Sequence, residues 1–193
     1  MNTTTTASAK VSPSSTLPVT WTLDPAHTTV SFSVRHLMIT NVRGEFQKVS
    51  GSATFDRNHP ELTKLEANID VASINTREPQ RDAHLRSADF FDAEKFPHLT
   101  YVSKSARSSG NGKLAIVGDL TIHGVTREVT LEVTDITEEQ KDPWGKTRIG
   151  ASASTKIKRS DFGMTWNAVL EAGGVTVGDE IKISLDASLI KNA

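Results

Sequence analysis

The residues of this chain best suited to binding a metal or to moving protons are its six histidines. They are His27, His36, His59, His84, His98 and His123. None of them forms an H-x-H, H-x₃-H or HExxH pattern, the spacings that bring two imidazoles onto one metal ion. Cysteine is absent, so no thiolate can bind a metal or act as a nucleophile. We therefore expect no metal site and no cofactor.

Nucleophilic catalysis has equally little support in the sequence. No G-x-S-x-G motif is present. Asp82 and His84 stand two positions apart, and residues at that spacing do not share a helix face. A non-catalytic protein is therefore the main prediction. An enzyme that uses His84 or His123 stays open as an alternative.

Composition and charge exclude several classes of partner. The net charge is −1 and the isoelectric point is near 6.6, so we expect no binding to nucleic acid and no electrostatic attraction to an anionic membrane. No apolar run approaches the ~20 residues that span a bilayer. The N-terminal residues contain no apolar stretch of the ~7–15 residues typical of a signal peptide, and a cytoplasmic location is therefore expected.

The 193 residues predict one folded domain after a short tail. Residues 1–20 are rich in Thr, Ser and Pro and cannot bury themselves, so we interpret them as a flexible tail. Residues 21–193 form the predicted domain. Most of it alternates apolar and polar residues with period two, which is typical of strands with one dry face. The predicted strands are 21–24, 29–36, 42–56, 65–73, 99–105, 114–122, 128–133, 149–157 and 180–190.

One segment, Arg81 to Pro97, breaks this alternation. Its apolar residues Ala83, Leu85, Ala88 and Phe91 are spaced as in a helix, and the pair Asp82 and Arg86 at i,i+4 favours one. Pro79 before the segment and Pro97 after it keep the helix short. The segment predicts a helical insert at the end of a sheet, where its phenylalanines either close a core or line a cavity.

Two glycine-containing sites carry further predictions. Asn111-Gly112 is the strongest short signal for a β-hairpin. Gly118 interrupts the apolar face formed by Leu114, Ile116 and Leu120, so we expect a bulky group to approach the backbone there.

Two other breaks in the pattern are interpreted as local irregularities. The alternation slips between Phe46 and Val49, which predicts a β-bulge in one long strand. Gly173-Gly174 predicts a turn.

About eight main strands with short connections and no βαβ alternation predict an antiparallel, all-β fold with a short helical insert. Eight strands can close into a barrel that either is filled by side chains or holds one ligand. Several predicted inward positions are small, which favours a hollow centre. They are Gly44, Gly51, Ala53, Ala67, Ala151 and Ala153.

Seven motifs resemble those of the YceI-like family of bacterial polyisoprenoid-binding proteins. They are Asp24-Pro25-Ala26-His27, Val34-Arg35-His36-Leu37, Val42-Arg43-Gly44-Glu45-Phe46, the block from Arg81 to Asp92, Phe96-Pro97, the block from Gly118 to Thr126, and Arg159-Ser160-Asp161-Phe162-Gly163. The resemblance covers residues 21–191. It implies an eight-stranded antiparallel barrel of lipocalin-like shape with a long apolar tunnel.

The resemblance also implies a ligand: a polyisoprenoid, an isoprenoid quinone or a fatty-acid-like lipid that is carried, stored or sequestered. Capture of lipophilic antibiotics or other foreign apolar compounds as a stress response is an alternative, and an enzyme that acts on an isoprenoid-like substrate is a second one. Many relatives are periplasmic, and related barrels often form homodimers. The residues expected to line the tunnel are Phe32, Val34, Phe46, Phe55, Ile69, Val71, Leu85, Phe90, Phe91, Phe96, Tyr101, Leu120, Ile122, Phe162, Met164 and Trp166.

Polar anchors for such a ligand are few. Arg81 and His84 are candidates for contact with a head group. Alternatively, Arg81, Asp82 and Arg86 fix the insert to the rim of the barrel, and Arg159 and Asp161 have the same two interpretations.

Overall fold

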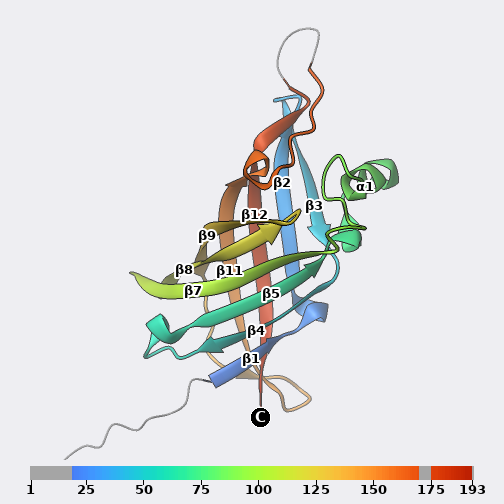
Figure 1. Ribbon diagram of the computed structural model, residues 1–193. Coiled ribbons are helices and arrows are strands. Elements are labelled where there is room, and N and C mark those ends of the chain that lie inside the picture. The colour runs from blue at the N-terminus through green and yellow to red at the C-terminus, as the bar shows by residue number, and fades with distance from the viewer. Residues whose placement is uncertain (1–18, 170–174, 193) are drawn as a thin grey trace, which may run out of the picture.

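The computed structural model describes residues 19–169 and 175–192, and its fold consists mainly of β-strands (Figure 1). The strands are β1 (Val19–Leu23), β2 (Thr29–His36), β3 (Thr40–Phe46), β4 (Val49–Phe55), β5 (Lys64–Asp70), β6 (Ile74–Asn75), β7 (His98–Gly110), β8 (Lys113–Ile122), β9 (Val125–Thr134), β10 (Gln140–Lys141), β11 (Thr147–Lys158) and β12 (Val177–Lys191). The helices are η1 (Pro25–His27), η2 (Pro60–Leu62), η3 (Val71–Ser73), α1 (Pro79–Arg86) and η4 (Arg159–Phe162), of which only α1 is an α-helix.

Eight of these strands form a closed antiparallel barrel. Their order around the ring is β1, β4, β5, β7, β8, β9, β11 and β12. The ring closes because β12 pairs with β11 along one edge and with β1 along the other, where Leu189 faces Leu23. The predicted eight-stranded antiparallel barrel with one short helix is confirmed.

Three strands extend the wall beyond this ring. Strand β12 pairs with β2 over Val177–Asp186. It does so along the same edge that pairs with β1 nearer the C-terminal end of β12. Strand β3 follows β2, and the short β6 pairs with Glu45 and Phe46 of β3. Helix α1 lies beside β3 (Figure 1). The barrel is therefore longer on the side of β11, β12, β2 and β3 than on the side of β4 and β5.

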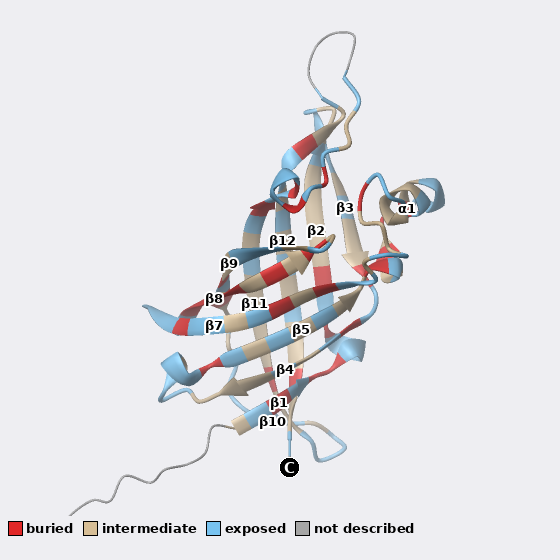
Figure 2. Cartoon of the chain, viewed as in Figure 1, coloured by how far each residue is buried: buried red, intermediate tan, exposed pale blue. Residues whose placement is uncertain are grey.

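The period-two pattern explains why these segments are strands with one buried face. In β8, Leu114, Ile116, Leu120 and Ile122 are all buried. Figure 2 shows buried and exposed residues alternating along the strands. Apolar burial of this kind stabilises a sheet by roughly 25 cal/mol for each Å² removed from water.

The predicted bulge between Phe46 and Val49 is wrong. Strand β3 ends at Phe46 and β4 begins at Val49, and the two strands pair with different neighbours. The slip in the alternation therefore marks a two-residue connection between strands. The predicted Gly173-Gly174 turn lies outside the described residues, as does the expected tail up to residue 18. Val19 and Thr20 were predicted to belong to the tail, but they are the first two residues of β1.

The Asn111-Gly112 hairpin is confirmed. Asn111 has φ 51° and Gly112 has φ 71°, which are the values of a type I′ turn between β7 and β8.

Gly118 has the predicted bulky neighbour. A Cβ at Gly118 would lie 2.7 Å from Cζ of Tyr101 and 2.6 Å from the carbonyl oxygen of Val102. The Tyr101 hydroxyl donates to the carbonyl oxygen of Ile116 at 2.8 Å. Burial, with a smaller contribution from Asp119, raises the pKa of Tyr101 to about 12. The phenol thus directs its polar end into the wall and its ring toward the barrel centre.

The helix in the insert is shorter than its apolar spacing predicted. It ends at Arg86, Ala83 and Ala88 are exposed, and its one buried residue is Asp82. The i,i+4 pair of Asp82 and Arg86 does not form. The Asp82 carboxylate instead accepts hydrogen bonds from the backbone N–H and hydroxyl of Thr76.

Candidate functional site

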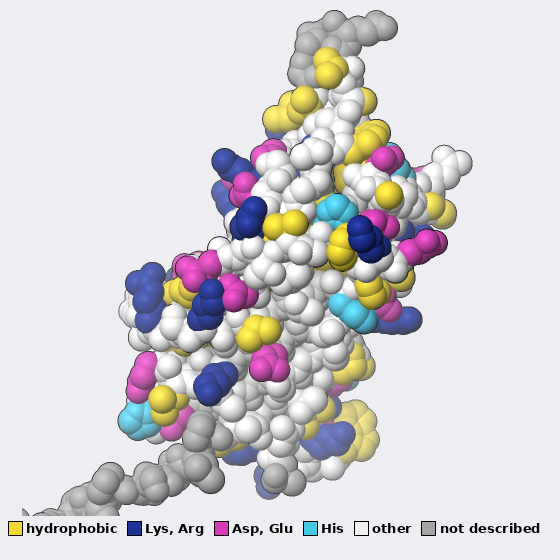
Figure 3. Space-filling view, in the orientation of Figure 1, with side chains coloured by type: hydrophobic (Ala, Val, Ile, Leu, Met, Phe, Trp, Pro, Cys, Tyr) yellow, Lys and Arg dark blue, Asp and Glu magenta, His cyan; other side chains and the backbone are white. Residues whose placement is uncertain are grey.

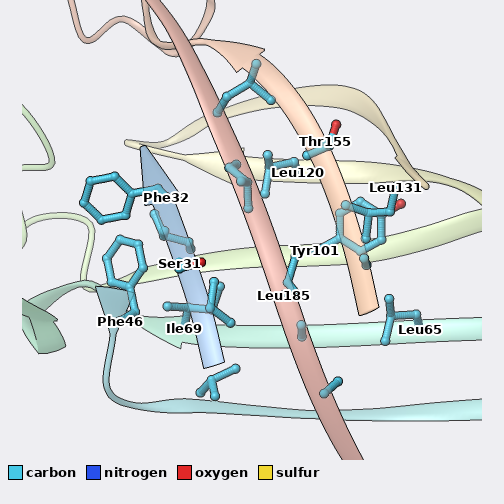
Figure 4. A pocket seen from close by; sticks show the side chains of 18 of the residues that line it. Ser31, Phe32, Phe46, Leu65, Ile69, Tyr101, Leu120, Leu131, Thr155 and Leu185 are labelled. Atoms are coloured by element: carbon cyan, nitrogen blue, oxygen red, sulfur yellow. The ribbon is translucent and has the colours of Figure 1, made fainter. Parts of the chain in front are cut away.

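The barrel encloses a cavity of about 240 Å³, called the tunnel below, which is the candidate functional site (Figure 4). Its wall comes from the inward faces of the ring strands, from β2 and β3, and from the insert. Nearly all lining side chains are apolar. The polar exceptions are Ser31, Thr63, Tyr101, Thr155 and Arg159.

The tunnel follows β12 for most of that strand's length. Its lining residues there recur at every second position between Ile181 and Leu189, and Val177 extends the line. At about 3.3 Å per residue, the distance from Val177 to Leu189 is about 40 Å. The site is therefore long and narrow, a shape suited to an extended chain.

Alanines keep the tunnel open. Ala53, Ala67, Ala151, Ala153 and Ala187 line it. In Figure 4 side chains from several strands converge on the open centre. Small residues on neighbouring strands leave room that larger side chains would fill.

The two glycines predicted as small inward residues do not line the tunnel. A Cβ at Gly44 would lie 2.5 Å from Cζ of Phe32 and 2.7 Å from Cγ2 of Thr76, so its space is already occupied. A Cβ at Gly51 would lie 2.4 Å from the carbonyl oxygen of Glu66. These glycines allow close packing within the wall. Their assignment as tunnel space is wrong.

Most of the residues predicted for the wall do line the tunnel. They are Phe32, Val34, Phe46, Phe55, Ile69, Leu85, Phe90, Phe91, Tyr101, Leu120, Ile122 and Met164. That each of these residues contacts a ligand stays a prediction.

Four predicted wall residues lie elsewhere. Val71 and Phe162 are in 3-10 turns, with 0% and 1% of their surface exposed, and they fill ordinary core. Phe96 packs edge-on against His123, with ring centroids 5.0 Å apart. Trp166 packs against Phe90 and His84 outside the tunnel wall. Aromatic character alone did not distinguish wall from core.

Sequence reasoning omitted many wall residues on the later strands. Their signal was present, because these residues occupy the inward period-two positions of β8, β9, β11 and β12. The prediction favoured aromatic residues and therefore left out these aliphatic positions. They include Leu114, Ile116, Leu131, Val133, Ile149, Ile157, Ile181, Ile183, Leu185 and Leu189.

At one end of the tunnel, called the insert end below, α1 and the following residues pack against the segment after η4. The ring of Trp166 lies 4.7 Å from that of His84 and 5.2 Å from that of Phe90. His84 Nε2 lies 2.8 Å from Asp89 Oδ2. Phe90 lines the tunnel and is buried, so this aromatic cluster covers the tunnel where the insert meets the barrel.

Polar contacts at the insert end fix the insert to the barrel. Arg81 donates to the hydroxyl and the carbonyl oxygen of Thr76, both at 2.8 Å. Arg86 donates to the carbonyl oxygens of Ala72 and Ile74. These contacts favour the interpretation that the charges tether the insert. Neither Arg81 nor His84 lines the tunnel, and their contact with a head group stays a prediction.

Arg159 holds the neighbouring segment in place. It is 6% exposed, and its guanidinium donates to the carbonyl oxygens of Met164, Trp166, Val177 and Gly178. Burial lowers the pKa of Arg159. Its contacts support the interpretation of Arg159 as rim scaffolding.

At the opposite end of the tunnel, called the ionic end below, the lining residues Ile149 and Leu189 lie next to an ionic cluster around Arg148, which is not itself part of the lining. Its guanidinium donates to both Asp24 and Asp142, and its Nε lies 2.7 Å from the Asp142 carboxylate. The hydrogen bond from Arg148, followed by the contact with His27, holds the pKa of Asp24 far below its usual range. The hydrogen bond from Arg148 also lowers the pKa of Asp142. Next to this cluster, the 2% exposed Trp21 packs with Ile149 and Leu189.

The described residues place only one of the two histidines considered for catalysis, His84, beside a carboxylate, that of Asp89. They contain no group of three or more His, Cys, Asp or Glu side chains placed to hold a metal ion. His123 Nδ1 lies 3.4 Å from the carbonyl oxygen of Phe162, a backbone contact that gives the imidazole no acidic partner. Within residues 19–169 and 175–192, no helix has the length and apolarity needed to cross a membrane. The absence of a cofactor stays a prediction.

Comparison with known proteins agrees with this architecture. The sequence profile of the YceI-like domain matches residues 21–189. A UPF0312 protein of Staphylococcus aureus (strain MSSA476) is 36% identical over 168 residues, which cover 86% of this chain and 95% of the relative.

Solved structures with the same fold include BcnA of Burkholderia cenocepacia and a polyisoprenoid binding domain from Saccharophagus degradans. BcnA has a TM-score of 0.76 and 26% identity, and covers 86% of this chain and 98% of its own. The Saccharophagus domain has a TM-score of 0.65 and 15% identity, covers 89% and 98%, and shows the shared fold alone. From the profile match over residues 21–189 and the Staphylococcus relative, the chain belongs to the YceI-like family.

Proposed function

We propose that this protein binds one long apolar amphiphile in its tunnel and carries, stores or sequesters it without catalysis. The ligand class is a polyisoprenoid, an isoprenoid quinone or a fatty-acid-like lipid. The observation that carries the proposal is a tunnel about 40 Å long whose wall is almost wholly apolar. The fold shared with a polyisoprenoid binding domain supports it.

The energetics of such binding are favourable. Apolar burial is non-directional, so a flexible chain needs no fixed pattern of partners along the wall. At about 0.3 kcal/mol per heavy atom, a chain of roughly forty carbons would gain about 12 kcal/mol, which corresponds to nanomolar affinity. The polar part of the ligand would lie outside the apolar wall, in contact with polar groups at the tunnel end or with water, because the wall offers it few partners.

Organic extraction of protein purified without detergent, followed by mass spectrometry, tests the proposal. Native mass spectrometry of the same sample gives the stoichiometry. We expect one prenyl chain, quinone or fatty-acid-like molecule per protein. A protein that is isolated empty and takes up none of these lipids when they are added would contradict the proposal.

The apolar wall also favours a second candidate function, the capture of lipophilic antibiotics or other foreign apolar compounds. A wall with few polar groups discriminates weakly among hydrophobic ligands. Competition of such compounds against a bound quinone measures how strongly the tunnel discriminates among hydrophobic ligands. Displacement at similar concentrations by chemically unrelated compounds would support capture, and retention of the quinone against all of them would exclude it.

A further inference from the structure

The turn between β2 and β3 has an unusual composition for its geometry. Leu37 and Met38 have φ values of 50° and 59°, and the N–H of Ile39 donates to the carbonyl oxygen of His36 at 3.1 Å. This is a type I′ turn, whose two central positions favour Asn and Gly. Leucine and methionine are strained there, since left-handed backbone costs side chains with a Cβ free energy.

A second hairpin of the same protein has preferred residues at its two left-handed positions, in a loop that is one residue shorter. Asn111-Gly112 connects β7 to β8 at similar φ values. The β2–β3 turn therefore gives up stability that an Asn-Gly pair would provide. Strained backbone of this kind occurs at functional sites, which is a reason to ask what Leu37 and Met38 do.

These residues display apolar surface at the end of the molecule where β2 turns into β3. Ile39 is 76% exposed and Met38 is 52% exposed. Val169 is 84% exposed and pairs with Val175 in a neighbouring segment, which is joined to the turn because the Leu37 N–H donates to the carbonyl oxygen of Thr176. We call Met38, Ile39, Val169 and Val175 the apolar tip. In Figure 3 hydrophobic side chains gather at this upper end, and most charged ones lie lower.

The apolar tip is continuous with the insert end of the tunnel. Val34 and Val177 line the tunnel, and His36 pairs in register with Val177. The turn begins three residues after Val34, so about 10 Å of strand separates tunnel wall and tip. The ionic end, with its buried Trp21, lies at the other end of β12.

We propose that the apolar tip inserts into the surface of a lipid bilayer and so brings the insert end of the tunnel to the membrane. This inference rests on the proposed function, because an apolar cargo must be exchanged with a lipid phase. Four side chains offer far less than the ~800 Å² per partner of a stable protein interface, whereas a bilayer accepts a small apolar surface. Met38 shares a surface groove with Arg35, Lys182, Asp179 and Glu180, whose charges balance, so the surroundings of the tip favour neither zwitterionic nor anionic lipids.

Sedimentation with sucrose-loaded vesicles of equal parts phosphatidylcholine and phosphatidylglycerol tests the proposal. We expect wild-type protein to bind, and the double variant Met38→Ser/Ile39→Ser to bind at least tenfold more weakly. The matched control is Trp144→Ser, because Trp144 is 79% exposed in the loop at the ionic end. Equal loss in the control and the tip variant, or no loss in the tip variant, would overturn the proposal.

The double variant Leu37→Asn/Met38→Gly separates binding from folding. Because it places preferred residues in the type I′ turn, we expect a higher melting temperature together with weaker vesicle binding. A rise in stability with unchanged vesicle binding would contradict the role of the tip.

Two further readouts complete the test. Native mass spectrometry of protein loaded from detergent micelles should show equal ligand occupancy in wild type and tip variants, so a failure of vesicle binding is distinguishable from a failure of the proposed function. Analytical ultracentrifugation should show one oligomeric state for all variants. A dimer that is lost in the tip variants would assign the tip to a second copy of this chain and overturn the bilayer proposal.

Discussion

The two ends of the tunnel differ in the contacts that join neighbouring segments across them, although the same apolar wall runs between them. At the ionic end, Arg148 lies between the carboxylates of Asp24 and Asp142. At the insert end, the contact between the insert and the segment after η4 is aromatic, through Trp166. Separating the ionic end leaves charges without partners, whereas separating the aromatic cluster costs only packing.

This difference assigns separate roles to the two ends. Charges that lose their partners while partly buried are strongly unfavourable, so the ionic end should stay closed at neutral pH. Aromatic pairs contribute about 0.5–1.5 kcal/mol beyond the area they bury, and separating them leaves no charge without a partner. We therefore expect ligand to enter and leave at the insert end, where the apolar tip also lies.

Among substitutions at the two ends, Arg148→Met should have the largest effect on stability. It removes the cation shared by Asp24 and Asp142, so the denaturant midpoint at pH 7 should fall clearly. Because folding lowers the pKa of Asp24, the stability that this carboxylate contributes is present above the ordinary value of about 4 and is lost as the pH falls below it. The difference between wild type and variant should therefore shrink toward pH 2.

The control for Arg148→Met is Lys104→Met. Lys104 also pairs with two carboxylates, Asp119 and Glu128, but it is about half exposed. Exposed ion pairs contribute little to stability. A loss in Lys104→Met as large as that in Arg148→Met would show that the ionic end is an ordinary surface cluster.

Asp82→Ala should have the next largest effect, and it acts at the insert end. The variant leaves the buried N–H and hydroxyl of Thr76 without their acceptor. We expect a loss of about 2–3 kcal/mol in the free energy of unfolding, measured by urea denaturation. Glu94→Ala, at an exposed position of the same insert, is the control and should change stability by less than about 0.5 kcal/mol.

Trp166→Ala should have the smallest effect on stability and a distinct effect on ligand exchange. The variant removes the aromatic contacts that join Phe90 and His84 to the segment after η4. We expect transfer of a bound quinone to acceptor vesicles to become several-fold faster. Unchanged transfer in Trp166→Ala, combined with faster transfer in Arg148→Met, would place the opening at the ionic end.

The fold could be predicted from the sequence because its causes are local. Period-two alternation specified the dry face of each strand, and Asn111-Gly112 specified a hairpin. The wrong strand boundary between Phe46 and Val49 arose because a two-residue connection and a bulge shift the alternation in the same way. Only the pairing of β3 with β2 and of β4 with β5 distinguishes them.

The site could be predicted only in part, because its geometry depends on which residue fills which space. Gly44 appeared to leave space in the barrel, but the ring of Phe32 occupies it. Val71 and Phe162 are as apolar as the wall residues, yet they lie in short 3-10 turns that bury them in the core. The partners of Asp82 and Arg159 also lie beyond local sequence, since Arg159 binds carbonyl oxygens up to 19 positions away.

The central claim, that the tunnel holds an apolar chain, is tested most directly by filling it. Ala153 lines the tunnel on β11, and the next residue, Ser154, is exposed on the other face of the same strand. Titration with an isoprenoid quinone, followed by native mass spectrometry, should show one bound molecule for wild type and for Ser154→Trp, and none for Ala153→Trp. Equal binding by the two tryptophan variants, with both folded by circular dichroism, would contradict the claim.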